Sequence, residues 1–468
     1  MDRNVLILTV DSLQYDCFAA PLSDIAEQVG AVEFTNAVST AIETRSAMPG
    51  LTAGVYDDAL ATQGPPETGG PPLLAELLAE NGYEGGLWTD NVLFSAEYNY
   101  DRGFTAGNSG RPTLRKRAAT AVQNSPLSPA FGLFEWAYFN VVQRASDLGT
   151  SDGSFYRSAA ELHDGALRWL DEGGDNPYLC WIHYMDAHHP YEPPARYLDD
   201  VPLHTERTRS ELGKLSRDVV KSNGRDHSWA DIEDVASAYR ACCAYLWDEL
   251  SAFLDRLIEA DHFDPESDVL VLTADHGECL DPRGFDLMGH VPTAFWEDVI
   301  HVPLAISRPD WEAGTIDGQV SLIDVMPTVL DAVGVPVPGE VDGKPRRTPE
   351  EMVSEHVLSV SQPPSGTPTY RAIRRSSGWK LFGRDTEPAD DVALTRYENH
   401  GNVDETIEGI VHASTSGDSP ETEPAATRWD HLMTELVDAR GPPIEEQGRS
   451  DPSTSVDEAH LRSLGYLE

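Results

Sequence analysis

The chain has 468 residues, of which 40% are hydrophobic and 8% aromatic, so it can fold as one large α/β domain plus a smaller one. This composition excludes an intrinsically disordered protein. Acidic residues number 79 against 34 lysines plus arginines, and the formal net charge of -45 argues against a nucleic-acid partner, because duplex binding requires a clustered basic face.

The same charge balance predicts a halophilic host, because the acidic residues are spread along the whole chain and lysine is rare beside arginine. Such a surface repels itself at low salt, and concentrated salt screens it, since the Debye length falls to about 3 Å at 1 M. An odd number of cysteines and no apolar leader predict a reducing, cytoplasmic location. The apolar stretch at 131–142 is too short to span a bilayer, so we expect no stable membrane insertion.

Three apolar runs predict strands that are buried on both faces. They cover residues 5–10 (Val-Leu-Ile-Leu-Thr-Val), 178–185 and 268–274. A long helical pattern lies between the last two, over residues 229–260. In an open α/β sheet the carboxyl ends of the strands converge on the binding crevice, so the residues that follow these runs are candidates for a site.

The pattern changes towards the carboxyl end of the chain. A further strand is predicted at 302–306, but past residue 345 the buried-strand pattern stops, and residues 370–382 indicate only a short antiparallel pair. Residues 414–427, rich in Ser, Thr, Glu and Pro, are typical of a solvated linker. We therefore predict an α/β catalytic domain over residues 1–345 and a smaller subdomain over residues 346–468.

Polar and ionisable residues follow each of the three buried runs. Asp11 follows the first, His188 and His189 lie just after the second, and Asp275 and His276 follow the third. Any one of these taken singly has a structural explanation, such as a helix cap at Asp11. All of them together are better explained by a site. Carboxylates suit Mg²⁺, Ca²⁺ or Mn²⁺, while an imidazole also admits Zn²⁺, so Asp11, Asp275 and His276 are predicted metal ligands.

The order of these motifs closely resembles the sulfatase family of the alkaline phosphatase superfamily. The matching segments, in chain order, are residues 4–13, 188–194, 273–278, 289–290, 296–304, 323–328, 371–374 and 461–467. The resemblance implies an α/β, alkaline-phosphatase-like fold with a mixed, mainly parallel central sheet flanked by helices and a smaller C-terminal α+β subdomain. It also implies one divalent metal ion, and it places His188 and His290 at the substrate oxyanion.

The nucleophile segment departs from the family pattern. Residues 44–54 read Thr-Arg-Ser-Ala-Met-Pro-Gly-Leu-Thr-Ala-Gly, and aligning their Leu-x-x-Gly end with the family places Thr44 at the nucleophile position. Threonine cannot become the formylglycine of sulfatases, but a metal-bound threonine hydroxyl resembles the nucleophile of phosphodiesterases in the superfamily. Ser46 is a second candidate. Arg45 either pins a substrate oxyanion or points to solvent. Arg45, Ser46 and His189 are the predicted substrate contacts.

Two enzymatic interpretations follow. Overall similarity favours a sulfatase-type hydrolase, in which Thr44 attacks while His188 and His290 stabilise oxygens and one of them protonates the leaving group. A phosphodiesterase, phosphatase or phosphoglycerol transferase is favoured by Thr44, by Ser12 in place of a second aspartate, and by the lack of a lysine after His290.

A third interpretation, of another class, is a non-catalytic protein that binds sulfated or phosphorylated glycans. A second metal is a further hypothesis, with Asp186, His189 and His290 as its ligands. In either enzymatic interpretation the partner is a small-molecule or glycan ester, selected by loops that we place at 106–150 and after residue 380.

Overall fold

The computed structural model describes residues 3–60, 64–66, 69–95, 98–107, 155–280, 288–290, 295–363, 369–384, 391–396 and 406–412. The predicted linker at 414–427, the apolar stretch at 131–142 and the family-like segment at 461–467 lie outside these residues. None of the helices in the described part combines the length and hydropathy that a membrane span requires.

A nine-stranded mixed sheet forms the centre of the molecule, with strand order β4-β3-β5-β1-β6-β7-β2-β8 and β9 paired with β2. Its strands are β1 (Val5–Val10), β2 (Val32–Val38), β3 (Glu84–Thr89), β4 (Ala106–Gly107), β5 (Tyr178–Tyr184), β6 (Val269–Ala274), β7 (His301–Ser307), β8 (Gly314–Ile316) and β9 (Val320–Ser321). Only β7 among these runs antiparallel to its neighbours, β2 and β6. The sheet confirms the predicted mixed, mainly parallel class.

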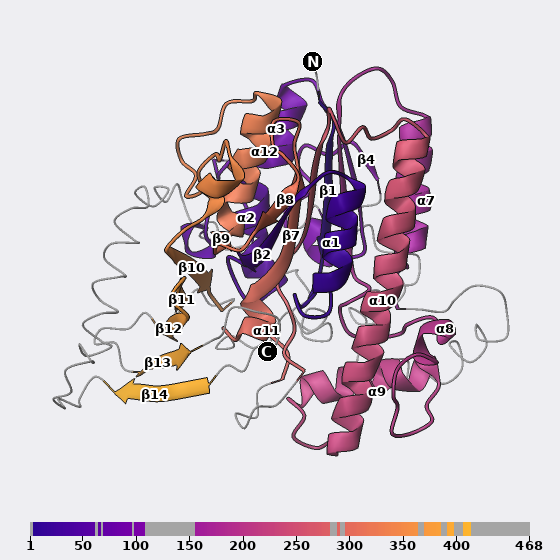
Figure 1. Ribbon diagram of the computed structural model, residues 1–468, viewed down its shortest axis with the longest axis vertical. Helices are drawn as coiled ribbons and strands as arrows, with labels where there is room; N and C mark the ends of the chain where they lie inside the picture. Colours follow the sequence, from indigo (N-terminus) through magenta and orange to yellow (C-terminus); the bar gives the residue numbers. More distant parts are fainter. Residues whose placement is uncertain are drawn as a thin grey trace, which may run out of the picture.

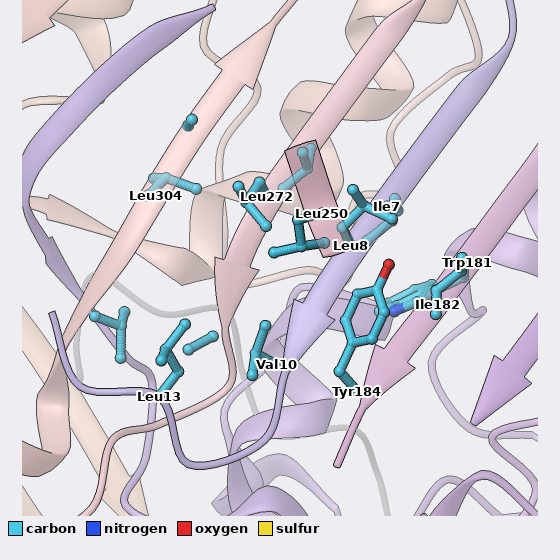
Figure 2. Close-up of a cluster of buried hydrophobic side chains, with 14 of the residues drawn as sticks. Ile7, Leu8, Val10, Leu13, Trp181, Ile182, Tyr184, Leu250, Leu272 and Leu304 are labelled. Atoms are coloured by element: carbon cyan, nitrogen blue, oxygen red, sulfur yellow. The ribbon is translucent and has the colours of Figure 1, made fainter. Parts of the chain in front are cut away.

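Strand β1 occupies the middle of the sheet because all six of its residues are buried. It pairs in parallel with β5 on one side and β6 on the other. Side chains from these strands pack into one core, in which Figure 2 labels Leu8, Ile182 and Leu272; Leu250, from the helix Trp229–Glu259, belongs to the same core. The continuous apolar runs of these three strands therefore mark the positions at which both faces of the sheet are covered.

Helices cover both faces of this sheet (Figure 1). One layer contains α1 (Ala19–Gln28), α7 (Ala159–Asp171) and the long α10 (Trp229–Glu259); the other contains α2 (Thr44–Ala53), α3 (Leu74–Glu80) and α12 (Val325–Val333). The shorter α8 (Ala195–Leu198) and α9 (Arg209–Lys221) pack against α10, and α11 (Glu297–Ile300) precedes β7. The predicted helix at 229–260 is thus confirmed almost to the residue.

A second, antiparallel sheet follows, with strand order β10-β11-β12-β13-β14. Its strands are β10 (His356–Ser361), β11 (Tyr370–Arg375), β12 (Trp379–Arg384), β13 (Asp391–Arg396) and β14 (Thr406–His412). The predicted antiparallel pair corresponds to β11 and β12. The buried strand β10 was not predicted, because its polar residues Ser359 and Ser361 interrupt the apolar pattern. The domain division at residue 345 stays a prediction.

Buried charges join the second sheet to the central one. Arg374 of β11 donates to both carboxylate oxygens of Glu297 at 2.7–3.1 Å, and Lys380 of β12 donates to the same carboxylate at 3.0 Å. All three side chains are buried. Arg374 also donates to Gln319 at 2.9 Å. Two buried cations of the second sheet therefore share one carboxylate at the start of α11.

Candidate active site

The predicted metal ligands converge at the carboxyl ends of two adjacent strands. Asp11 follows β1 and Asp275 follows β6, and the backbone N–H of Asp275 donates to Val10 O at 3.2 Å. His276 comes next in the chain. The three side chains are fully buried and offer ligand atoms that lie within 4.8 Å of one another. The structure thus brings together all three residues of the predicted metal site.

Ser12 ties the two carboxylates to each other. Its hydroxyl donates to Asp11 Oδ1 at 2.9 Å, and its backbone N–H approaches Asp275 Oδ1 at 3.3 Å. Its φ of 63° lies in the left-handed region, which non-glycine residues rarely adopt and which is concentrated at functional sites. The serine that departs from the family's paired aspartates therefore orients the site.

His276 presents a nitrogen lone pair to the same point. Its Nδ1 lies 2.7 Å from the carbonyl oxygen of Gly277, which can only accept, so Nδ1 carries the proton and Nε2 is left as an acceptor. Nε2 lies 3.8 Å from Asp11 Oδ1 and 3.7 Å from Asp275 Oδ2. Burial, reinforced by His290, lowers the pKa of His276, so the imidazole stays neutral as a metal ligand must.

The charges at this point fit a divalent cation. Burial and the charge of Asp11 raise the pKa of Asp275 to about 7. Burial alone would raise the pKa of Asp11 too, but His188, His183 and His276 hold it well below its usual range. Asp275 Oδ2 is buried and has no hydrogen-bond partner in the described part of the chain. A divalent ion would satisfy that oxygen and stabilise both carboxylates in their ionised form.

The two candidate nucleophiles face different groups. Thr44, the first residue of α2, donates its hydroxyl to Asp11 Oδ2 at 3.1 Å and lies 3.3 Å from His276 Nε2. Ser46 donates instead to Glu43 Oε1 at 3.1 Å. The helical turn therefore directs Thr44, and not Ser46, into the cluster of metal-type ligands.

Arg45 is bound by the protein itself. Its Nη2 donates to Glu43 Oε1 and to the carbonyl oxygen of Gln362, and its Nη1 lies 3.8 Å from Asp57 Oδ2. The residue is 4% exposed, so its guanidinium does not point to solvent. These contacts fasten the start of α2 to the end of β10. A substrate contact for Arg45 stays a prediction, as it does for Ser46.

Three further histidines line the cluster. The rings of His188 and His189 stack at 4.3 Å, and that of His290 lies 4.8 Å from the ring of His276. Neither ring nitrogen of His189 has a hydrogen-bond partner among the described residues, although the side chain is buried. His290 Nδ1 lies 3.1 Å from Glu278 Oε1. Burial opposes protonation of His290, but Glu278 outweighs it and raises the pKa to about 9.

The hypothesis of a second metal has less support. Within the described ranges, the only group of acid and imidazole side chains with metal-binding spacing is that of Asp11, Asp275 and His276. Asp186 Oδ1 instead accepts from the backbone N–H of Ala159 at the start of α7, at 3.2 Å. A second ion at Asp186, His189 and His290 stays a prediction.

Several residues of the site were missed from the sequence. Asn91 donates to Asp11 Oδ2 at 2.9 Å, and His183 Nε2 lies 3.6 Å from the same oxygen. Glu278 belongs to the matching segment 273–278, but no role was predicted for it. Asn91 follows β3, whose sequence Glu-Gly-Gly-Leu-Trp-Thr lacks a continuous apolar run. The one feature of the sequence that could have indicated Asn91 is the polar pair Asp90-Asn91, which directly follows Leu-Trp-Thr.

Comparisons with known proteins agree with this geometry. Residues 3–335 match the family model described as Sulfatase. A stretch of 234 residues is 31% identical to arylsulfatase K of Homo sapiens, covering 43% of this chain and 41% of that protein. A stretch of 199 residues is 25% identical to the uncharacterized sulfatase YidJ of Escherichia coli K12, covering 40% and 36%. The match thus spans less than half the length of these curated relatives.

The fold is also similar to solved structures. A phosphonate monoester hydrolase from Silicibacter pomeroyi superposes with a TM-score of 0.63 at 19% identity, over 92% of this chain and 94% of that one. The 2-O GAG sulfatase BT1596 superposes with a TM-score of 0.57 at 15% identity, over 94% and 93%. At these identities the similarity shows the fold alone.

Proposed function

The chain belongs to the sulfatase family, and we propose that it hydrolyses sulfate esters with Thr44 as the nucleophile. One observation carries the nucleophile assignment. The hydroxyl of Thr44 lies within hydrogen-bond distance of Asp11 Oδ2 and His276 Nε2, two of the three clustered metal-type ligands. Family membership supports a hydrolase of sulfuric or phosphoric ester bonds, and the sulfate ester is the finer proposal.

Asp11, Asp275 and His276 would hold the metal ion. When bound there, a divalent cation favours the ionised form of a nearby hydroxyl and offsets the charge that develops on the ester oxygens. Two buried carboxylates suit Mg²⁺, Ca²⁺ and Mn²⁺, and the imidazole nitrogen of His276 suits Mn²⁺ and Zn²⁺ better than Ca²⁺. We therefore propose that the site holds one ion. Mn²⁺ suits both the carboxylates and the imidazole, so it is the first ion to test.

The chain's own residues supply the remaining steps. The hydroxyl of Thr44 gives its proton to Asp11 Oδ2, to which it donates at 3.1 Å, as Oγ1 forms a bond to sulfur in line with the leaving oxygen, whose bond to sulfur breaks. His290, protonated through its contact with Glu278, gives its proton to that oxygen. The imidazole N–H of His189, which has no hydrogen-bond partner among the described residues, would donate to a non-bridging oxygen. Neutral His290 then takes a proton from the water that forms a bond to sulfur. Thr44 Oγ1 leaves the sulfur and takes back its proton from Asp11, which restores Thr44 and protonated His290.

Paired chromogenic substrates test this proposal. Hydrolysis of an aryl sulfate, an aryl phosphate and an aryl phosphodiester would be compared in multimolar KCl with each divalent ion added in turn. We expect Thr44→Ala to lower kcat by at least about a thousandfold, as loss of a nucleophile does elsewhere, and Ser46→Ala to change it little. Full activity of Thr44→Ala, or its loss in Ser46→Ala alone, would contradict the assignment.

A phosphodiesterase or phosphonate-ester activity is the second candidate. A threonine at the nucleophile position, in place of a residue that can become formylglycine, favours it, and the phosphonate monoester hydrolase from Silicibacter pomeroyi shares the fold. Turnover of the phosphodiester without turnover of the sulfate would establish this alternative. Metal binding and glycan affinity with no turnover of any ester would establish a binding protein.

We also propose that the protein works in a salt-rich cytoplasm. The formal net charge of -45 supports this, because a folded chain with such a charge is stabilised when salt screens its self-repulsion. Thermal unfolding as a function of KCl concentration tests the salt dependence. A melting temperature that does not rise between low and multimolar KCl would argue against a halophilic host.

A further inference from the structure

Strand order places an asparagine beside the metal ligand Asp11. In the register of the central sheet, Thr9 of β1 pairs with His183 of β5, and His183 pairs on its other side with Thr89 of β3. Asp11 lies two residues beyond Thr9, and Asn91 lies two residues beyond Thr89. The two side chains therefore leave the sheet at the same level, across the width of β5.

The orientation of the Asn91 amide is determined by the backbone. Its Oδ1 accepts the backbone N–H of Leu93 at 2.9 Å, at the start of the short helical turn Val92–Phe94. A backbone N–H can only donate, so the oxygen must face Leu93 and the Nδ2 must face the other way. That Nδ2 lies 2.9 Å from Asp11 Oδ2, and the side chain is 1% exposed.

Buried side chains of β1 and β5 support this contact. Asn91 Nδ2 also lies 3.4 Å from His183 Nε2, and His183 Nδ1 lies 2.9 Å from Thr9 Oγ1. The same Thr9 oxygen accepts the indole N–H of Trp181 at 2.9 Å. Each of these side chains is buried within the sheet. The donor that meets Asp11 is therefore held both by the turn at Leu93 and by a histidine of the packed strand β5.

Asp11 has a donor on each of its carboxylate oxygens. Ser12 binds Oδ1, and Asn91 binds Oδ2, the oxygen that also accepts from Thr44. Two fixed donors on opposite oxygens prevent the carboxylate from rotating. Hydrogen bonds of this kind orient ligands towards a metal, and their loss typically costs about 10- to 100-fold in metal affinity or activity.

We propose that Asn91 is a positioning residue of the metal centre, which orients Asp11 through Nδ2. This inference rests on the metal site of the proposed function, and it does not depend on which ester is cleaved. A purely structural role is the alternative, because the Oδ1 of Asn91 also caps the turn at Leu93. Serine and threonine keep a capping oxygen but are too short to reach Asp11, so they separate the two roles.

The chain offers a matched control at the other end of β1. The side chain of Asn4 likewise accepts a backbone N–H with Oδ1, from Tyr178 at 3.2 Å, and donates with Nδ2 to a carboxylate, Asp268 Oδ2, at 3.2 Å. It has the same chemistry as Asn91 but lies at the amino end of the strand. Asn4 is partly exposed where Asn91 is buried, so Asn4→Ser controls for the loss of such an amide outside the site, and thermal unfolding compares the folding of the two variants.

The experiment is a titration of the metal-free full-length protein with Mn²⁺ in multimolar KCl, with the heat of binding measured by calorimetry. Wild type, Asn91→Ser and Asn4→Ser are compared. We expect Asn91→Ser to raise the Kd about 10- to 100-fold and Asn4→Ser to leave it within about twofold. Thermal unfolding without metal shows whether each variant is folded. Should Asn91→Ser leave too large a cavity to fold, Asn91→Thr fills more of it and keeps the capping oxygen.

Two results would overturn the proposal. One is a Kd for folded Asn91→Ser or Asn91→Thr within about twofold of wild type, and the other is an equal rise in Asn4→Ser. No substrate is present, so these results hold whether or not the protein hydrolyses sulfate esters. A wild-type chain that binds neither Mn²⁺ nor any of Mg²⁺, Ca²⁺ and Zn²⁺ would refute the metal centre itself, and this proposal with it.

Discussion

The buried pair of His290 and Glu278 makes the proposed acid step testable. His290 Nδ1 lies 3.1 Å from Glu278 Oε1, and both side chains are nearly inaccessible. Burial alone would lower the pKa of His290 below its ordinary value of 6.5, yet the charge and hydrogen bond of Glu278 raise it to about 9. The proton that His290 carries at neutral pH therefore depends on one carboxylate.

Glu278→Gln keeps the size and the hydrogen-bonding oxygen of the side chain but removes its charge. With burial largely unopposed, the pKa of His290 should fall to about 6.5 or lower. At pH 8 the protonated fraction would then drop from about 90% to about 3%, so a step that needs this proton should slow about 30-fold. The sign is definite: activity is present below the pKa of His290 and is lost as the pH rises through it.

The assay is the pH dependence of kcat/KM for an alkyl sulfate, whose leaving oxygen needs a proton, beside a nitrophenyl sulfate, whose leaving oxygen does not. We expect the basic limb to move by about 2.5 pH units or more for the alkyl ester and little for the nitrophenyl ester. Wild type and Glu278→Gln would both hold the metal ion. The comparison is therefore of the shift between their basic limbs and not of the absolute pH of either limb.

A weaker perturbation of the same carboxylate provides a control. Tyr191 donates to Glu278 Oε2 at 3.4 Å, so Tyr191→Phe should shift the limb far less than Glu278→Gln does. An unmoved basic limb in Glu278→Gln would refute the reasoning. So would an equal shift for both esters, because the titrating group would then not be the acid that protonates the leaving oxygen.

Three further predictions concern stability. Glu297→Gln leaves the buried cations Arg374 and Lys380 without their carboxylate, and urea unfolding in KCl should show a loss of about 3–5 kcal/mol. Gly50→Ala would place a methyl group 2.6 Å from Thr40 Oγ1, so we expect a loss of about 1–3 kcal/mol in the same measurement, with a lower kcat because α2 carries the nucleophile. Removing divalent ions with a chelator should lower the melting temperature, and adding them back should restore it.

Matched variants control the first two of these. Glu355 pairs with Arg375 in an exposed setting, so Glu355→Gln should change the free energy of unfolding by no more than about 1 kcal/mol. Gly174 has open space around it, so Gly174→Ala should be tolerated. Equal losses in Glu297→Gln and Glu355→Gln would contradict the buried-charge argument. A melting temperature insensitive to the chelator would argue against the metal centre.

The sequence by itself determined the centre of the sheet and the three residues of the candidate metal site. The strands β1, β5 and β6 are continuous apolar runs because both of their faces are covered, and such runs are visible without any partner. The ends of parallel strands meet at one edge, so Asp11, Asp275 and His276 could be grouped from their positions after these runs. The structure places the three side chains together, and their role as metal ligands stays a prediction.

The tertiary structure decided what local patterns leave open. Thr44 and Ser46 are both hydroxyl residues in one segment, and only the start of α2 at Thr44 separates them, since residues two apart on a helix point in different directions. Arg45 was open between an oxyanion and solvent until the fold brought Glu43 and Gln362 to it.

Asn91 shows the same limit most clearly. Its strand β3 has two glycines and no continuous apolar run, so neither the strand nor the residue after it was predicted. Its contact with Asp11 joins positions 80 residues apart in the chain. That contact exists because β5, formed much later in the sequence, inserts between β3 and β1. Periodicity is a local property of the chain, whereas strand order is set by packing of the whole sheet, and that packing decides which polar side chains surround the candidate metal ligands.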